Sequence, residues 1–308
     1  MRAIFRASIG LVVAAVLSGC GTAGMWGNAP LPGVAAGLGA PAQQSAGILY
    51  VDDGGNRAVD MFNNGGWKKV GRITNGIGAI NRNWVDTQGN LYLAQFSPVQ
   101  IVEYAPGGSG PSFIYDSRMQ LPVDVTTDTA GNVYEADELT SSVNEYAHHT
   151  NLVSASCANG SALFLSDAVD GNGDVFVGVE TGGRGRIMEY SGGLNGCHAT
   201  KLGVALNFPA GMALDENGDI VVCDEGNNSV DIIPPPYNKI SGTLGSGYNW
   251  PLTVRINAKN DRAYVVDEGP PSDVFILNYP SGSLIKTLTS KNGVSGATGA
   301  VDSDNFNP

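Results

Sequence analysis

The chain has few of the residues on which most catalytic chemistry depends. It holds three histidines and four cysteines in 308 residues, and no two cysteines have the C-x-x-C spacing of zinc or thioredoxin-like redox sites. The G-x-S-x-G signature of serine hydrolases is missing as well. The glycine-rich stretches at 107–110 and 182–185 lead into no helical pattern, so they are not phosphate-binding loops. These absences exclude the sequence signatures of several large enzyme classes.

Basic residues and helical patterns are also scarce. The 17 Lys and Arg side chains are outnumbered by 29 Asp and Glu, which gives a formal net charge of −12. Binding to a phosphate backbone needs clustered Lys and Arg, so we expect no nucleic-acid partner. No apolar run of useful length has the 3.6-residue period of a helix, and 43 Gly and 16 Pro argue further against a helical solenoid.

A five-residue turn motif recurs along the chain at an almost constant period. Four copies read D-x-x-G-[N/D], a fifth is degenerate, and successive copies are 42, 42, 45 and 42 residues apart. Aspartate at the first position can bond its own backbone and glycine tolerates a positive φ, which is typical of a tight hairpin. Repeats of this length indicate one supersecondary unit copied many times. The five copies begin at Asp86, Asp128, Asp170, Asp215 and Asn257.

Short apolar runs with strand character flank every turn. In the fourth copy residues 211–214 precede the turn, residues 220–222 follow it, and a third run covers 229–233. A Gly/Pro/Ser-rich corner and a fourth short run then close the unit. Four short antiparallel strands in about 40–50 residues are the signature of a propeller blade. We therefore predict an all-β fold, a six-bladed β-propeller with four antiparallel strands per blade.

The two ends of the repeat region complement each other. Residues 47–51, 57–62 and 67–73 match the second, third and fourth strands of a blade, but no first strand precedes them. Residues 299–302 resemble the missing first strand. We expect the C-terminal strand to complete the blade that the N-terminal strands begin, because closing the ring removes two exposed sheet edges.

These repeats resemble the NHL-repeat family and related six-bladed propellers. The resemblance is carried by copies such as residues 208–219 followed by residues 223–230, and it covers residues 47 to 302. It implies the fold but not the function, because this scaffold hosts enzymes, ligand binders and assembly modules.

The N-terminus has the pattern of an export signal. Arg2 and Arg6 are followed by an apolar stretch at 9–17, which is too short for a default membrane span. The stretch ends in Leu-Ser-Gly-Cys20, which resembles a bacterial lipobox with cleavage before a lipidated Cys20. An ordinary signal peptide, or a buried cysteine, is the alternative.

This pattern divides the chain into three parts. Residues 1–19 are predicted to be a lipoprotein signal peptide, 20–46 the lipidated Cys and a flexible Gly/Ala/Pro-rich tether, and 47–308 the propeller. We expect an extracytoplasmic protein of the cell envelope, on the outer membrane or at the periplasmic face. Its contact with the membrane would be a lipid anchor and not a span.

Three further cysteines lie in the predicted propeller. Cys157 and Cys197 fall in Gly/Ser/Asn-rich outer segments of neighbouring blades, and an exported protein can form disulfides. A Cys157–Cys197 disulfide and two unpaired thiols are both open. Cys223 lies inside an apolar run and is interpreted as a small core residue.

Carboxylates recur after the second strand of most blades, at the mouth of the predicted channel. Asp137, Asp224 and Asp267 are the candidate metal ligands, because hard cations such as Ca²⁺ take oxygen ligands. The alternative is that each repeated Asp caps the loop that follows it, since a feature shared by the blades is more often structural.

Residues that break the repeat pattern are better site candidates. The resemblance implies that first strands line the channel, and these strands carry Asp124, Asp167, Arg82 and Arg255, while Gln95 fills the slot of the repeated Asp in one blade. We take these five as candidate ligand-binding residues, with Glu135 as a further candidate. A salt bridge between an Arg and an Asp of this set is the structural alternative.

Two functions are the main candidates from these patterns, and a purely structural protein of the envelope is a third. The first is a monomeric, lipid-anchored binding or interaction module for a protein, glycan or small ligand, without turnover. The second is a metal-dependent hydrolase of the gluconolactonase or lactonase type, with a divalent cation at the channel mouth. His148, His149 and His198 fall on the outer rim, which argues against resemblance to propeller lyases that use channel histidines.

Overall fold

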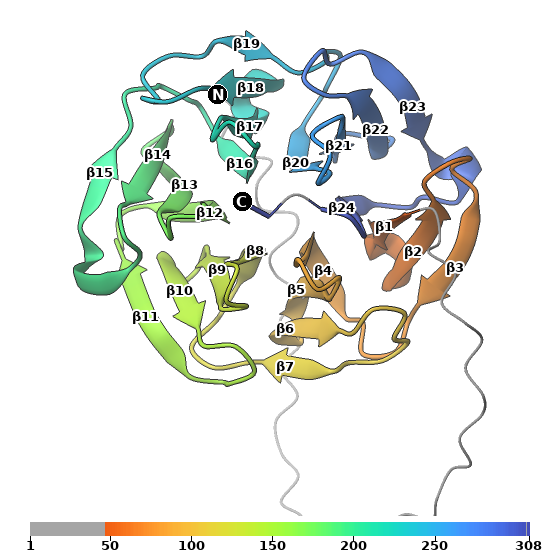
Figure 1. Cartoon of the computed structure of the whole chain (residues 1–308), viewed down its shortest axis with the longest axis horizontal. Helices are drawn as coiled ribbons and strands as arrows, with labels where there is room; N and C mark the ends of the chain where they lie inside the picture. Colours follow the sequence, from red (N-terminus) through yellow and green to blue (C-terminus); the bar gives the residue numbers. More distant parts are fainter. Residues whose placement is uncertain (1–46, 306) are drawn as a thin grey trace, which may run out of the picture. The chain divides into compact units, whose positions relative to one another are not determined.

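The computed structural model describes residues 47–305 and 307–308. These residues form six four-stranded sheets arranged as the blades of a ring (Figure 1). The predicted signal peptide, Cys20 and the tether up to residue 46 lie outside the described residues. Within the described part, no helix is long and apolar enough to cross a membrane.

Each of the first three blades runs from an inner strand near the channel to an outer strand at the rim (Figure 1). Blade one consists of β24, β1, β2 and β3, at Ala297–Asp302, Ile48–Asp53, Ala58–Asn63 and Lys69–Ile73. Blade two consists of β4 to β7, at Ala79–Val85, Leu91–Ser97, Val99–Tyr104 and Phe113–Tyr115. Blade three consists of β8 to β11, at Pro122–Thr127, Val133–Asp137, Ser142–Tyr146 and Val153–Ala158.

The other three blades repeat this arrangement. Blade four consists of β12 to β15, at Leu163–Val169, Val175–Thr181, Arg184–Tyr190 and Ala199–Lys201. Blade five consists of β16 to β19, at Pro209–Leu214, Ile220–Asp224, Ser229–Ile233 and Gly242–Thr243. Blade six consists of β20 to β23, at Pro251–Ile256, Arg262–Asp267, Asp273–Asn278 and Leu284–Leu288. Short 3₁₀ turns complete the described chain, at Gly54–Asn56 (η2), Asn195–Cys197 (η3), Glu225–Asn227 (η4) and Ser290–Asn292 (η5).

The recurring turn motif forms the hairpin between the first two strands of a blade. In blade two, Oδ1 of Asp86 accepts the backbone N–H of Gln88 at 2.9 Å and of Asn90 at 2.8 Å, and Gly89 has φ +83°. Only a residue without a side chain takes this conformation at little cost. The same carboxylate bonds recur at Asp128, Asp170 and Asp215. The periodic sequence signal therefore has a direct structural cause.

The ring closes as the sequence predicts. β24 pairs with β1 in antiparallel register, with Tyr50 opposite Val301 and Leu49 opposite Asp302. The closing strand begins at Ala297, two residues before the predicted stretch. The all-β six-bladed propeller with four antiparallel strands per blade is confirmed.

The hydrophobic core consists of layers between neighbouring blades. One such layer joins Ala168, Phe176 and Ile187 of blade four to Met212 and Val222 of blade five. A Cβ added at Gly178 would lie 2.8 Å from the carbonyl oxygen of Pro209, so glycine allows the two blades to approach closely. Interiors packed in this way are rigid, and side chains at the channel and rim are held in fixed positions.

Candidate functional site

The channel is crossed by one arginine. Arg255 on β20 is fully buried, and its guanidinium donates to the carbonyl oxygens of Asn83 at 3.1 Å and Met212 at 2.9 Å. Its Nη2 also lies 2.6 Å from Oδ1 of Asp124. Asn83, Met212 and Asp124 belong to three different blades. A single side chain therefore ties inner strands from four blades together.

The second channel arginine binds the same carboxylate. Nη1 of Arg82 lies 3.8 Å from Oδ2 of Asp124 and donates to the carbonyl oxygen of Val123 at 3.0 Å. The structure thus brings together three predicted ligand-binding residues, Asp124, Arg82 and Arg255, but it pairs them with one another. These contacts match the salt-bridge alternative, and the prediction that the three residues contact a ligand gains no support from them.

Asp167 and two other carboxyls near the channel are fully buried. Oδ2 of Asp167 accepts the Thr126 hydroxyl at 2.5 Å, and its Oδ1 has no partner among the described residues. Burial, together with the charge of Asp124, raises the pKa of Asp167 to about 7. Burial also raises the pKa of Asp52 and of Glu135 well above the usual range. These groups favour the neutral form, which costs less to bury than a carboxylate.

Gln95 forms hydrogen bonds with the loop that leads into its own blade. Its Oε1 accepts the backbone N–H of Gly78 at 2.6 Å, and its Nε2 donates to the carbonyl of Gly76 at 3.1 Å. The side chain is fully buried. Both ends of the amide are therefore occupied by backbone, and the prediction of Gln95 as a ligand-binding residue is not supported by its contacts.

The carboxylates predicted to bind metal cap the loops that lead into the first strands. Asp224 accepts the backbone N–H groups of Asn207 and Phe208, the latter at 2.7 Å. Asp137 accepts from Leu121 N at 3.0 Å. Asp267 binds the N–H groups of Asn249 and Trp250 in the same manner, at 2.8 and 2.6 Å. The loop-capping alternative explains the recurrence of this residue.

Asp137, Asp224 and Asp267 do not gather around one point. Among the described residues, one group of three or more His, Cys, Asp or Glu side chains brings its ligand atoms within 4.8 Å of one another, and it contains none of these three. The described residues therefore do not bring these three carboxylates together, and their role as metal ligands stays a prediction. A Ca²⁺ ion elsewhere at the mouth stays a prediction.

The cysteines of the propeller divide into a bonded pair and a buried thiol. Cys157 on β11 and Cys197 in η3 form a disulfide, with their Cα atoms 5.3 Å apart. It links the rims of blades three and four. Cys223 lies in the core layer between blades five and six, as expected, and is not exposed.

A hollow lies at the outer edge of blade four, where the edge segment bulges. Leu202 N donates to the carbonyl of Ile187, and Leu206 and Gly185 exchange two backbone hydrogen bonds at 3.0 and 3.3 Å. Between these bonded positions the edge segment advances four residues, from 202 to 206, whereas β14 advances two, from 185 to 187. The extra residues arch away from the sheet and leave a hollow of about 590 Å³ beside Arg186.

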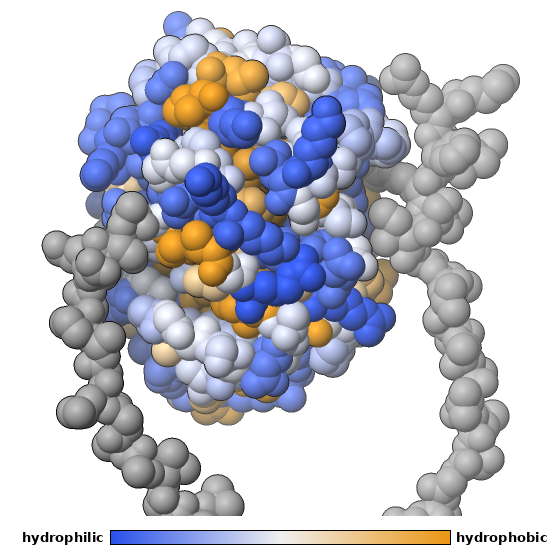
Figure 2. Space-filling model, turned by 90° about the vertical axis from the view of Figure 1, so that its right-hand side faces the viewer, coloured by the Kyte–Doolittle hydropathy of each residue, from blue (hydrophilic) through white to orange (hydrophobic). Residues whose placement is uncertain are grey.

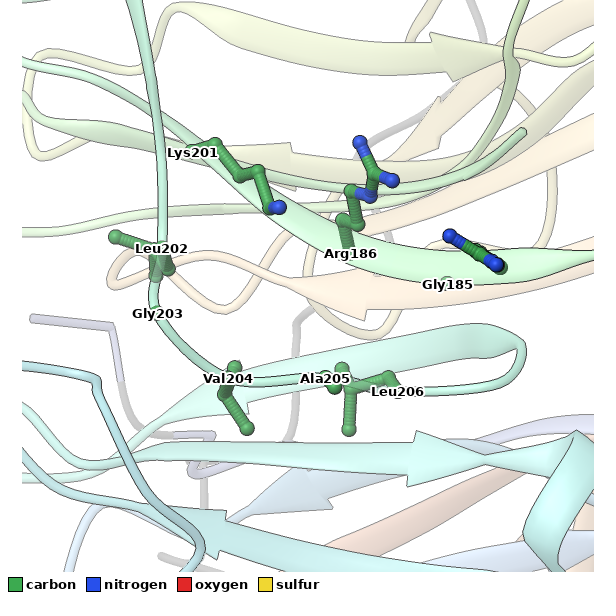
Figure 3. Close-up of a pocket in the computed structure, with 9 residues that line it drawn as sticks. Gly185, Arg186, Lys201, Leu202, Gly203, Val204, Ala205 and Leu206 are labelled. Atoms are coloured by element: carbon green, nitrogen blue, oxygen red, sulfur yellow. The ribbon is translucent and has the colours of Figure 1, made fainter.

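Three cations lie on one face of this edge. Lys201 pairs with Met188 across β14 and β15, and opposite residues of a sheet share a face. Arg186 and Arg184 precede Met188 at intervals of two, so they lie on that face as well. Figure 3 shows Lys201 and Arg186 extending from the two neighbouring strands at the hollow. None of the three cations has a hydrogen bond or ion pair within the described part of the chain.

The floor beside these cations is apolar. A second hollow of about 360 Å³ shares Arg186 and Lys201 with the first, and Phe164, Val179 and Met188 contribute to its lining. Both volumes fall in or near the range of small-ligand sites, about 300–1,000 Å³. We call the two hollows together the blade-four groove. Its chemistry suits an anionic group attached to an apolar body.

The rim on the other side of the ring has a different surface. Figure 2 shows that face, where apolar patches are broken up by hydrophilic side chains. Val70 on β3 and Leu284 on β23 are among its exposed apolar residues, with relative exposed surfaces of 56% and 58%. Apolar residues scattered in this way are normal on a soluble surface and need no function.

The blade-four groove is not among the sites predicted from the sequence. The R-G-R pattern at 184–186 is a visible signal, because alternate residues of a strand share a face. Lys201 lies on the same face only because of the strand register. No sequence motif predicts the bulge that forms the hollow.

Comparisons with known proteins agree on the fold. The NHL repeat model matches residues 206–232, and the resemblance to NHL-repeat propellers is confirmed in this repeat and in the architecture. No curated protein sequence matches the chain significantly.

Two solved structures illustrate the likeness. A chain in the crystal structure of a nidogen/laminin complex matches with TM-score 0.67 and 14% identity, covering 83% of this chain and 98% of that one. A protein of unknown function from Bacteroides caccae matches with TM-score 0.64 and 13% identity, covering 84% and 99%. At such identities the likeness concerns the fold alone, and function has to be argued from the residues of this chain.

Proposed function

We propose that this six-bladed propeller with an NHL repeat is a binding module of the cell envelope, and that it takes its ligand at the blade-four groove. The ligand class is an acidic segment of a partner protein that also carries aromatic or aliphatic side chains. The lipidated Cys20 would hold the module at the membrane.

The observation that carries this proposal is the set of unpaired cations. Arg184, Arg186 and Lys201 share one face in a chain whose formal net charge is −12. No ion pair within the described part of the chain uses their charges. A basic patch on an acidic protein attracts acidic partners and speeds their encounter. The apolar floor favours a peptide over an acidic glycan, because glycans offer less apolar surface for burial.

The channel is the less suitable place for a ligand. Arg255 is fully buried and its guanidinium already has acceptors in several blades. A ligand that competed for these groups would have to break a buried ion pair, which costs several kcal/mol.

The scaffold and the disulfide are compatible with this role. One structural neighbour comes from a complex of two proteins, nidogen and laminin. The Cys157–Cys197 disulfide fits an oxidising compartment outside the cytoplasm. Localisation is tested by a Cys20→Ser variant, which should move from the membrane fraction to the soluble fraction. Membrane retention of this variant would contradict lipid anchoring at Cys20.

Binding is tested with a labelled peptide of alternating glutamate and phenylalanine, followed by fluorescence anisotropy. We expect Arg186→Glu/Lys201→Glu to weaken binding at least tenfold. Lys286→Glu/Lys239→Glu is the matched control, because it makes the same charge change at exposed positions of blades six and five. Its affinity should stay within twofold of the parent.

Raised salt should weaken binding of the parent protein, because screening reduces the charge attraction. Equal losses in the two double variants would contradict a specific groove and indicate a general charge effect.

A further inference from the structure

Two histidines and a buried glutamate meet between the rims of blades two and three. Glu103 lies on β6, and His148 and His149 lie in the turn between β10 and β11. One ligand atom from each lies within 4.8 Å of the others, and this is the one such group of three among the described residues. Imidazole and carboxylate together are ligands that zinc prefers.

The carboxylate of Glu103 is held in place before any ion binds. The residue is 2% exposed, although it lies near the rim. The Ser112 hydroxyl lies 3.3 Å from Oε1, and the Tyr115 hydroxyl lies 3.5 Å from Oε2. Outer partners of this kind orient a metal-binding carboxylate.

Three features fix the position of His149. Its backbone N–H donates to the Tyr115 hydroxyl at 3.2 Å, and its ring stacks on Phe113 with centroids 5.3 Å apart. Its φ is +49°, in the left-handed region that non-glycine residues rarely adopt. Such strain is concentrated at functional sites and turns. Nε2 of His149 consequently lies 3.0 Å from Oε1 of Glu103.

His148 lies next to this pair and is free to adjust. Its ring centroid is 4.0 Å from that of His149. The ring lies over Gly131, where an added Cβ would be 3.0 Å from Cγ of His148. The side chain is exposed, so a rotation of its ring can bring a nitrogen closer to the other two ligand atoms.

We propose that Glu103, His148 and His149 bind a Zn²⁺ ion that bridges blades two and three. Tetrahedral zinc with ligand bonds of about 2.0–2.2 Å separates neighbouring ligand atoms by about 3.4 Å. The 3.0 Å between Glu103 and His149 is already close to that value. The ion would take the place of the proton that these two groups share, and water would complete its coordination.

The test is calorimetric titration of the full chain with ZnCl₂, with CaCl₂ as a comparison. All proteins carry Cys20→Ser, so that this thiol does not bind zinc. We expect one saturable zinc site, any heat from calcium to be the same in the parent and the histidine variants, and at least tenfold weaker zinc binding in His148→Ala and His149→Ala. His198→Ala is the matched control, because it removes the third histidine of the chain outside this group.

Two further readouts distinguish the site from a plain Glu–His ion pair. Zinc should raise the unfolding temperature of the parent but not of His148→Ala, because a ligand that binds only the folded state stabilises it. Zinc binding should also weaken as the pH is lowered, because protons compete with zinc for the imidazole nitrogens. The proposal is overturned by the absence of a saturable zinc site, or by equal losses in His148→Ala and His198→Ala.

Discussion

The channel and the blade-four groove both contain arginines, but the channel arginines are paired with acceptors of the fold and those of the groove are not. In the channel, Arg255 is fully buried and meets the Asp124 carboxylate and carbonyl groups of several blades. In the groove, Arg186 is half-buried, and its guanidinium has no charged or hydrogen-bonding partner in the described part of the chain. Arginines in the channel have acceptors inside the protein, whereas charge in the groove is left for solvent or a ligand.

This difference separates charges that support the fold from charges that serve binding. A buried charge without a partner is too costly to keep, so each buried arginine has to find acceptors within the fold. An exposed cation has no such requirement, and three cations on one face repel one another without stabilising the fold. The groove is therefore the better candidate for a site that binds a partner.

Removing the channel arginine should have the largest effect on stability. Arg255→Met leaves Asp124 buried with Arg82 as its remaining charged partner, at 3.8 Å. Breaking a buried pair from one side costs about 3–5 kcal/mol. We expect a loss of this size in the free energy of unfolding measured by urea denaturation.

The double variant Arg255→Met/Asp124→Asn controls for the loss of packing. It removes the Asp124 charge as well and leaves Arg82 bonded to the carbonyl oxygens of Val123 and Leu165, so it should recover part of the stability. A loss below about 1 kcal/mol in Arg255→Met would show that the channel charges are not a structural unit.

The disulfide comes next in expected size. Cys157→Ser/Cys197→Ser removes a crosslink between the rims of blades three and four, with a sequence separation of 40 residues. A crosslink of this kind contributes about 2–4 kcal/mol, mainly by restricting the unfolded chain. Thermal unfolding with and without reductant measures the effect. Reductant should destabilise the parent and leave the double variant unchanged, and an unchanged parent would contradict the disulfide's role.

Asp167→Asn should change the pH dependence of stability. The pKa of Asp167 is raised from 3.8 to about 7, so the folded state holds this proton more tightly than the unfolded state. Its contribution is present below about pH 4 and is lost as the pH rises through about 7. We expect the variant to match the parent at pH 4 and to be more stable at pH 8, on the order of 4 kcal/mol. Parallel pH profiles for the two proteins would contradict this assignment.

The fold was predictable from the sequence because its signal is local and repeated. Asp86 and Gly89 specify a turn through their own backbone contacts, and later copies specify the same turn. Ring closure followed from a strand that was missing at one end and present at the other. Neither inference needed the position of a distant side chain.

The candidate sites were less predictable because they depend on register and on contacts between blades. Asp124 and Arg255 are visible in the sequence because they break the repeat pattern, but that they bind each other across the channel follows from the ring geometry. Lys201 joins Arg186 only through the pairing of β14 with β15. Glu103 meets His149 across two blades, 46 residues apart in the chain.

The most direct test of the account measures peptide affinity and stability on the same two variants. Arg186→Glu/Lys201→Glu should lose at least tenfold in affinity for the acidic peptide, while its free energy of unfolding stays within about 0.5 kcal/mol of the parent. Arg255→Met, measured where it is still folded, should keep its affinity and lose stability. Lost affinity in Arg255→Met, with unchanged affinity in the groove variant, would contradict the division between a structural channel and a binding groove.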